Sequence, residues 1–179
     1  MSTCIPRGWK NAEAIEATRD FLSQPPPRLA AIRDLVHEIQ SPDLFTRRCA
    51  ADLARRVSAS EPGILKKHVG PLIDLIAQLS DRQWQTRGYL TQAAALNLNT
   101  HAERMRLTRM LRIMANDKRI AVRAIALEAL GTVALAEPKL HEEVVTLLER
   151  ASGDGICAVR LRARRVLPAV LEAAEKVRR

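Results

Sequence analysis

One short pattern recurs four times along this chain of 179 residues, and it limits the available folds more than any other feature. Each copy begins with Asp or Ser and carries Arg six residues later. The copies run over residues 41–47, 81–87, 117–123 and 154–160, so their starts lie 40, 36 and 37 residues apart. Periods of about 20–50 residues are typical of proteins built from stacked copies of one supersecondary unit. We therefore expect a repeat array.

The match extends to the apolar residues on both sides of the pattern. Leu lies six residues before each start, and Ala or Leu lies three and seven residues after each Arg. These positions are Leu35, Leu75, Leu111 and Leu148, then Ala50, Leu90, Ala126 and Ala163, then Ala54, Ala94, Leu130 and Leu167. Agreement of this breadth is improbable by chance, so the four segments are interpreted as copies of one structural unit.

Hydrophobic periodicity predicts helices throughout the chain, with apolar residues at i, i+3, i+4 and i+7. The expected helices span residues 11–23, 28–40, 44–59, 64–79, 83–98, 101–115, 119–136, 138–151 and 156–177. Aromatic residues make up only 3% of the chain, while Ala, Leu, Arg and Glu are abundant, so the fold class is all-α. Gly70-Pro71 should kink or split its helix, and Pro168 should kink the last helix or end it early.

The repeated unit resembles that of the HEAT-repeat family, a helix, a short turn and a second helix that opens on an Asp…Val-Arg…Ala…Ala-Leu-Gly pattern. The third unit matches best, with Asp117, Val122, Arg123, Ala126, Ala129, Leu130 and Gly131. Ser41, Thr46 and Thr86 depart from the pattern. The resemblance implies a right-handed α-α superhelix, or solenoid, of about four helical hairpins. Its units would span residues 29–60, 64–99, 101–136 and 138–178 within an array over 28–179, preceded by an N-terminal segment, 1–27, that carries a capping helix.

The resemblance also implies a structural role for the recurrent charged residues. Six residues after the start of the turn, each Arg can reach the turn and the carboxylate of its own or the next repeat. In the family these residues form an Asp–Arg ladder that fixes the stacking of repeats. The corresponding residues here are Asp81, Asp117 and Asp154 with Arg47, Arg87, Arg123 and Arg160.

The formal net charge of +9 is not explained by this ladder, and it is concentrated in residues 81–116 and 154–179. Helical geometry places Arg106, Arg109 and Arg112 opposite the apolar stripe of one helix. Arg162 and Arg165 point outward from another helix, and Arg48 and Arg55 belong to a third, smaller group. In HEAT-like arrays the first helix of each unit lies on the convex side and the second helix on the concave side. These groups would therefore not share one face, whereas a stripe of cations that follows nucleic-acid phosphates requires one shared face.

Candidate partner contacts follow from the same arrangement. The expected concave row, five residues after each ladder Arg, is a mixture of charges: Asp52, Gln92, Glu128 and Arg165. Such a row suits a protein partner at least as well as a phosphodiester backbone. Trp84, in the turn of the second unit, is either a lid over the core between repeats or an anchor for a partner.

The sequence contains no recognised catalytic or metal-binding motif. The four histidines fall in different repeats, at spacings that suit ordinary surface positions, and His141-Glu142-Glu143 is interpreted as the polar face of a helix. Cys49 and Cys157 lie within apolar helical pattern and are expected in the core. We therefore expect no enzyme, no metal and no cofactor.

The function favoured by the sequence is that of a non-enzymatic scaffold for protein–protein interaction. The alternative is a basic nucleic-acid-binding protein that uses Arg106, Arg109, Arg112, Arg162 and Arg165. A glycosylase of the DNA-alkylation-repair type, working through Asp81, is less favoured because aromatic residues are scarce. The chain has no secretory leader pattern and no membrane-spanning run, so a cytoplasmic protein with no membrane partner is expected. The last repeat leaves self-association open.

Overall fold

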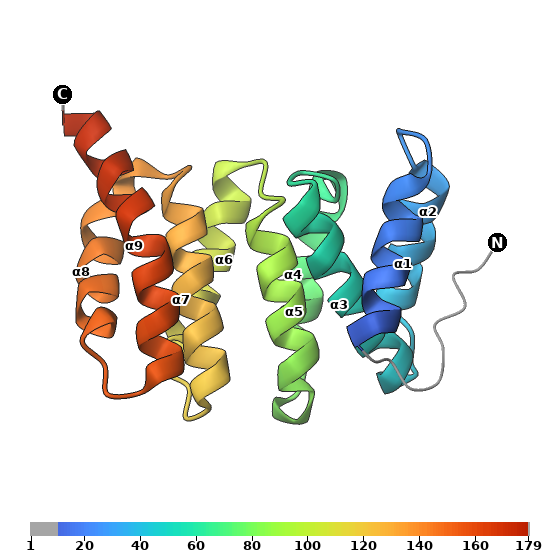
Figure 1. Ribbon diagram of the computed structural model, residues 1–179, viewed down its shortest axis with the longest axis horizontal. Helices are drawn as coiled ribbons and strands as arrows, with labels where there is room; N and C mark the ends of the chain where they lie inside the picture. The colour runs from blue at the N-terminus through green and yellow to red at the C-terminus, as the bar shows by residue number, and fades with distance from the viewer. Residues whose placement is uncertain (1–10, 179) are drawn as a thin grey trace. The chain divides into compact units, whose positions relative to one another are not determined.

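The computed structural model describes residues 11–178, and every regular element in that range is a helix (Figure 1). This confirms the all-α class. The helices are α1 (Asn11–Ser23), α2 (Leu29–Ile39), α3 (Leu44–Ser60), η1 (Lys66–His68), α4 (Val69–Gln78), η2 (Asp81–Gln83), α5 (Trp84–Ala95), α6 (His101–Met114), α7 (Ile120–Ala134), η3 (Pro138–Leu140), α8 (His141–Ser152) and α9 (Cys157–Arg178). The first ten residues of the expected N-terminal segment, Cys4 included, and Arg179 lie outside the described residues.

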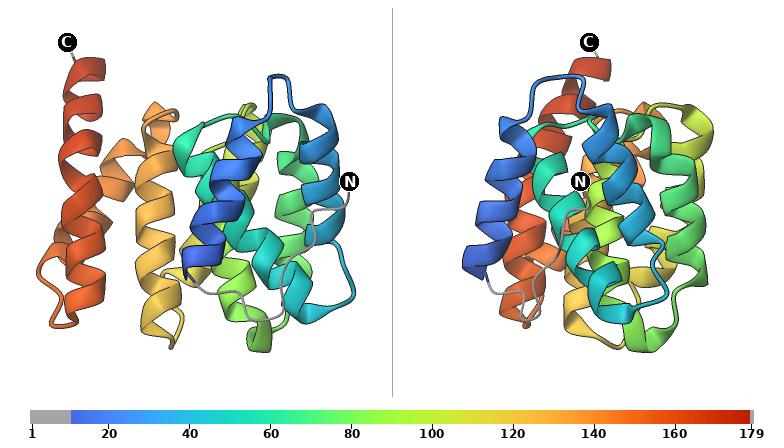
Figure 2. Two further views of the ribbon diagram at one scale, coloured as in Figure 1. Left: turned by 45° about the vertical axis from the view of Figure 1, so that its right-hand side comes forward. Right: turned by 90° about the vertical axis from the view of Figure 1, so that its right-hand side faces the viewer.

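The chain divides into two compact units, one up to Asn97 and one from Leu98 onward. In the first unit α3 packs against α1, α2 and α5, and α4 packs against α5. In the second unit α7 packs against α6, α8 and α9, and α8 lies along α9 (Figures 1 and 2). We name the pairs α2–α3, α4–α5, α6–α7 and α8–α9 the first to fourth hairpins. Each hairpin contains one copy of the repeated pattern at its turn.

The repeated apolar positions form the core of both units. Ten of the twelve are buried, and only Leu75 and Leu167 are half-buried. Small residues at these positions allow helices to approach closely.

Gly131 of α7, which directly follows one of these positions, lies at a close contact between helices. An added Cβ at Gly131 would lie 2.8 Å from Cγ2 of Val166 on α9. The glycine of the family-like pattern is therefore required by the packing of α7 on α9.

Two prolines act differently from one another. The helix expected at 64–79 begins only at Val69, after the short helix η1, so that Pro71 lies in the first turn of α4. A proline is tolerated there because the first N–H groups of a helix have no intrahelical partner. Pro168, by contrast, lies inside α9, which continues to Arg178. The expectation that this proline ends the helix early is therefore wrong.

Side-chain caps fix where two of the helices begin. The Asp43 carboxylate accepts a hydrogen bond from the Thr46 N–H at 2.7 Å at the start of α3. At the start of α6, Thr100 and Glu103 form a reciprocal capping box. Burial alone would raise the pKa of Glu103, but hydrogen bonds from the N–H groups of Thr100 and Asn99 outweigh it and lower the pKa. Helix α6 begins at His101, directly after the capping residue Thr100.

The two described cysteines differ in exposure. Cys49 is buried in α3, and burial raises the pKa of its thiol to about 11. Cys157 is exposed, so its expected place in the core is wrong. It lies two residues before the buried Val159, and a separation of two residues puts side chains on nearly opposite sides of a helix.

No helix within residues 11–178 combines the length and the apolar character needed to cross a bilayer.

Candidate functional site

The recurrent arginines bind the turns of their own hairpins. Arg47, Arg123 and Arg160 each donate to the backbone carbonyl oxygen six residues earlier, at 2.9, 3.2 and 2.7 Å. In the second hairpin the guanidinium of Arg87 lies 3.5 Å from the carboxylate of Asp81. A guanidinium is well suited to this position because it presents five N–H donors at the end of a long side chain. The turn end of every hairpin is thus closed by the same residue.

Two of the recurrent aspartates stabilise these turns by accepting hydrogen bonds from backbone N–H groups. The carboxylate of Asp117 accepts a hydrogen bond from the Arg119 N–H at 2.8 Å, and that of Asp154 accepts one from the Ile156 N–H at 2.7 Å. These are short-range bonds to the chain that leads into the second helix, of the kind by which Asp stabilises turns. The bonds described here lie within hairpins, and a ladder that joins one repeat to the next stays a prediction.

A second set of polar contacts, which was not predicted from the sequence, joins the two helices of three hairpins at the end opposite the turn. We call this end the open end and these contacts its closure. In the first hairpin Arg28 binds Glu61 at 2.8 Å. In the second, the side chain of Asn97 accepts a hydrogen bond from the Leu65 N–H at 2.7 Å and donates to Ser58 Oγ at 2.8 Å. In each case a residue just beyond the second helix binds a group near the start of the first helix. The sequence feature that could have indicated two of these closures is the dipeptide Glu-Pro, which occurs at Glu61-Pro62 and at Glu137-Pro138.

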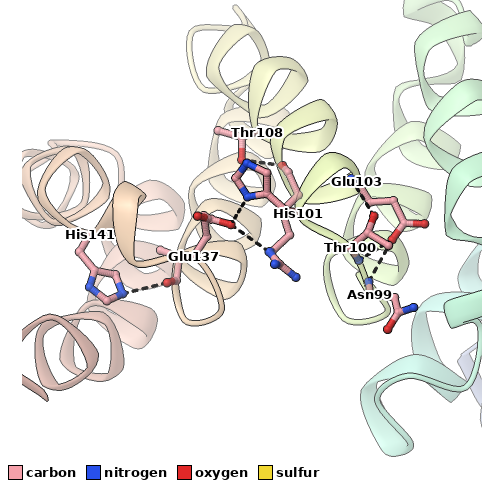
Figure 3. A network of polar contacts seen from close by, with 9 residues as sticks. Asn99, Thr100, His101, Glu103, Thr108, Glu137 and His141 are labelled. Atoms are coloured by element: carbon pink, nitrogen blue, oxygen red, sulfur yellow. Dashed lines mark hydrogen bonds and ion pairs between the residues drawn. The ribbon is translucent and has the colours of Figure 1, made fainter. Parts of the chain in front are cut away.

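The third hairpin has the fullest version of this closure (Figure 3). The buried carboxylate of Glu137 lies 2.7 Å from Nδ1 of His101 and accepts a hydrogen bond from Nε of Arg104 at 3.1 Å. His101 and Arg104 are three residues apart on the first turn of α6, so both face the same carboxylate. The hydrogen bond from His101 lowers the pKa of Glu137 most; burial acts in the opposite direction, and the bond from Arg104 adds to the lowering.

His141 lies close to this network but faces the core. Its Nε2 is 2.9 Å from the carbonyl oxygen of Ala134, and its side chain is buried (Figure 3). The interpretation of His141 as part of a polar helix face is therefore wrong, although Glu142 beside it is exposed. His101 keeps its expected surface position, with its side chain 58% exposed, and it also binds Glu137. Among residues 11–178, no group of three or more His, Cys, Asp and Glu side chains is placed to hold a metal ion.

In the first unit, three of the residues expected to contact a partner bind other side chains of the chain itself. Asp52 is only 5% exposed and accepts hydrogen bonds from both Arg55 and Arg56 at 3.0 Å. Its burial and pairing contradict its expected place in an accessible row. Arg55 also lies over the ring of Tyr89. Arg48 donates to Gln85 of the next hairpin at 3.3 Å.

Trp84 and Gln92 are the two remaining candidates in the first unit. Both are half-buried in α5, and Trp84 is its first residue. Partial burial leaves part of each side chain on the surface. Trp84 thus retains both of its expected roles, as a cover for the core and as an anchor for a partner.

In the second unit, carboxylates neutralise most of the candidate arginines. Arg112 of α6 binds Glu143 of α8 through two hydrogen bonds, at 2.7 and 2.6 Å. Arg162 and Arg165 of α9 both form ion pairs with Glu128 of α7, which is largely buried. Because these pairs join neighbouring hairpins, the arginines and Glu128 stabilise the unit. Arg106 and Arg109 lie exposed on α6.

Comparison with known proteins identified no relative. No family model matches the chain, and neither a curated protein nor a solved structure does so. The hairpin closures, the pairs between hairpins and the remaining exposed side chains are therefore the features on which a functional proposal rests.

Proposed function

We propose that this protein is a HEAT-like solenoid that acts as a non-enzymatic scaffold and binds another protein. The observation that carries the proposal is the recurrence of one architecture: four hairpins are each closed at the turn by the same arginine, and three of them are closed at the open end. In this proposal the hairpins stack as a right-handed superhelix. Stacked hairpins present extended surfaces, and in repeat proteins such surfaces are the usual binding sites.

The pairing of charges favours a protein partner over a nucleic acid. Non-specific binding to nucleic acids requires cations that neutralise phosphates and release counterions. Arg112, Arg162 and Arg165 already bind carboxylates of the chain. A surface of paired charges offers alternating donors and acceptors, which suits a protein surface of mixed polarity.

An affinity capture from the native host, run with and without nuclease, tests this function. We expect one or more proteins to be retained after nuclease treatment, at a stoichiometry that is unchanged by 200 mM salt. The nucleic-acid alternative predicts the opposite result: the captured material is lost with nuclease, and purified protein shifts duplex or single-stranded probes at about 50 mM salt. That binding should weaken with salt at a log–log slope near −0.9 per phosphate neutralised on duplex DNA. If nothing but nucleic acid is captured, the scaffold proposal is wrong.

A further inference from the structure

A cleft of about 400 Å³ lies within the second unit, between α6 and α8. Its apolar lining includes Leu127, Leu147, Ala151 and Val159. Its charged groups are Arg112, Arg123, Glu143, Arg150 and Asp154. The cleft lies in the range of about 300–1,000 Å³ that is typical of ligand sites in proteins. It is therefore large enough to accept at least one side chain of a partner.

The two carboxylates of the cleft are already engaged, whereas two of its three guanidiniums have donors to spare. Glu143 binds Arg112 through both carboxylate oxygens, and the carboxylate of Asp154 accepts a hydrogen bond from the Ile156 N–H. Arg123 uses one Nη1 hydrogen for the carbonyl oxygen of Asp117. The side chain of Arg150 forms no hydrogen bond or ion pair with any residue in the described range of 11–178. The cleft consequently has a local excess of positive charge.

We propose that this cleft binds a glutamate or aspartate side chain in an acidic segment of a partner protein. The carboxylate would be bound by Arg150 and Arg123, and the aliphatic part of the side chain would pack on Leu127 and Leu147. A bidentate guanidinium–carboxylate pair is strong and directional. This inference rests on the proposed function, because it names the chemistry of the protein that the scaffold binds.

The Arg112–Glu143 pair shows how a carboxylate binds at the rim of this cleft. Both oxygens of Glu143 face the guanidinium of Arg112, at 2.7 and 2.6 Å. The same pair also limits binding, because Glu143 occupies the donors of Arg112 and repels a second carboxylate nearby. Replacing Glu143 by Gln should therefore release Arg112 and tighten the binding of an added carboxylate. A residue with a purely structural role would not improve binding when it is removed.

The two carboxylates among the lining residues make a phosphodiester backbone a poorer occupant of the cleft. Glu143 and Asp154 flank the cleft, and a nucleic acid would bring several phosphates close to them. A peptide can present one carboxylate to Arg150 and Arg123 and neutral groups elsewhere. Charge complementarity thus favours an acidic peptide.

The test is a titration of the isotope-labelled full chain, followed by NMR of the arginine Nε–H groups. The probes are the tetrapeptide acetyl-Ala-Glu-Leu-Glu-amide and its uncharged counterpart, in which Gln replaces Glu. We expect saturable shifts of the Arg150 and Arg123 signals with the acidic peptide only. Arg150→Gln should weaken its binding about tenfold or more, because the substitution removes charge-assisted hydrogen bonds to the carboxylate. Glu143→Gln should strengthen binding several-fold.

Arg109→Gln is the matched control, because Arg109 is an exposed arginine of α6 that does not line the cleft. It should bind the acidic peptide as the wild-type chain does. Equal responses to both peptides, or equal losses in Arg109→Gln and Arg150→Gln, would overturn the inference. So would a single-stranded dT oligonucleotide that shifts Arg150 at lower concentrations than the acidic peptide. If a captured protein partner binds wild type and Arg150→Gln equally, the cleft is excluded while the scaffold function stands.

Discussion

Single side chains at close contacts decide much of the packing in this protein, and Gly131 is the clearest case. Its place in the pattern was visible in the sequence, but the reason for it lies on another helix, where Val166 leaves no room for a Cβ. Asn97 is similar: it is buried, and its amide serves three partners on α3, on α5 and before η1. Such residues derive their importance from neighbours that are distant in the sequence.

We expect Gly131→Ala to lower the free energy of unfolding by about 1–3 kcal/mol, because the added methyl group overpacks the contact between α7 and α9. Alanine would otherwise favour the helix by about 1 kcal/mol. Urea unfolding followed by circular dichroism measures the change. Gly155→Ala is the control, since an added Cβ there meets no atom within 4 Å. A Gly131→Ala variant that is more stable than wild type would contradict the close approach.

Replacing Asn97 by Ala should destabilise the first unit by about 1–3 kcal/mol, because the buried Leu65 N–H then loses its hydrogen-bond partner. Thermal unfolding of Asn97→Ala beside Asn99→Ala tests this expectation. Asn99 is exposed and binds Glu103 through its backbone N–H, which the substitution retains. Equal melting temperatures for the two variants would show that the Asn97 amide contributes nothing.

At the scale of the helix and the hairpin, local signals in the sequence predicted the structure well. Apolar periodicity and turn residues gave every α-helix to within a few residues, except that α4 begins at Val69 instead of near residue 64. The closures at the open ends were not predicted, because Glu137 and its partner His101 are 36 residues apart. The pair Arg112–Glu143 was missed for another reason: spacing shows which face of a helix a residue occupies, but not which residue of another helix it binds. Asp52 and Arg56 are four residues apart on one helix, so that pair could have been predicted from its spacing.

The closure of the third hairpin makes stability depend on pH. The pKa of Glu137 is lowered in the folded state, so its contribution is complete above about pH 4.5, the ordinary value for Glu, and is lost as the pH falls through the lowered pKa. We expect the stability difference between wild type and Glu137→Gln to shrink as the pH is lowered from about 6 to about 3. Urea midpoints at a series of pH values measure it.

The comparison with Glu137→Gln is needed because Glu103 and Glu143 also have lowered pKa values and titrate in the same range. Their contributions are common to both proteins and cancel in the difference. Glu149→Gln, at an exposed position on α8, serves as the control for removing one negative charge. A difference that stays constant over the whole pH range would mean that the Glu137 carboxylate is not bound by His101 and Arg104.

At the scale of the molecule, the chain forms two compact units, each with two hairpins and its own core. The number of hairpins was predictable from the repeats. The division after Asn97 was not, because the breaks between successive repeats look alike in the sequence, and only the pattern of contacts distinguishes one of them. Each unit contains the closures of its own hairpins.

We expect a polypeptide of residues 98–179 to fold without the first unit. It retains the core of α6 to α9, the closure by Glu137 and the pairs Arg112–Glu143 and Arg162–Glu128. Circular dichroism should show helix content like that of the same residues in the full chain, and urea should unfold the fragment in one cooperative transition. A fragment with a coil spectrum would show that the second unit depends on the first.

The hairpin closures have a consequence for how such a chain can change in length. Because the turn arginines and the open-end carboxylates of Glu61 and Glu137 bind partners in their own hairpin, a gene duplication or deletion of one whole hairpin leaves these closures of the others intact. The amide of Asn97 is the exception, since it also donates to Ser58 of the preceding hairpin. A cut within the third hairpin, by contrast, separates Glu137 from His101 and leaves the buried carboxylate of Glu137 without this partner. Viable length variants should therefore differ by whole hairpins, with breakpoints that follow the closing residues Glu61, Asn97 and Glu137.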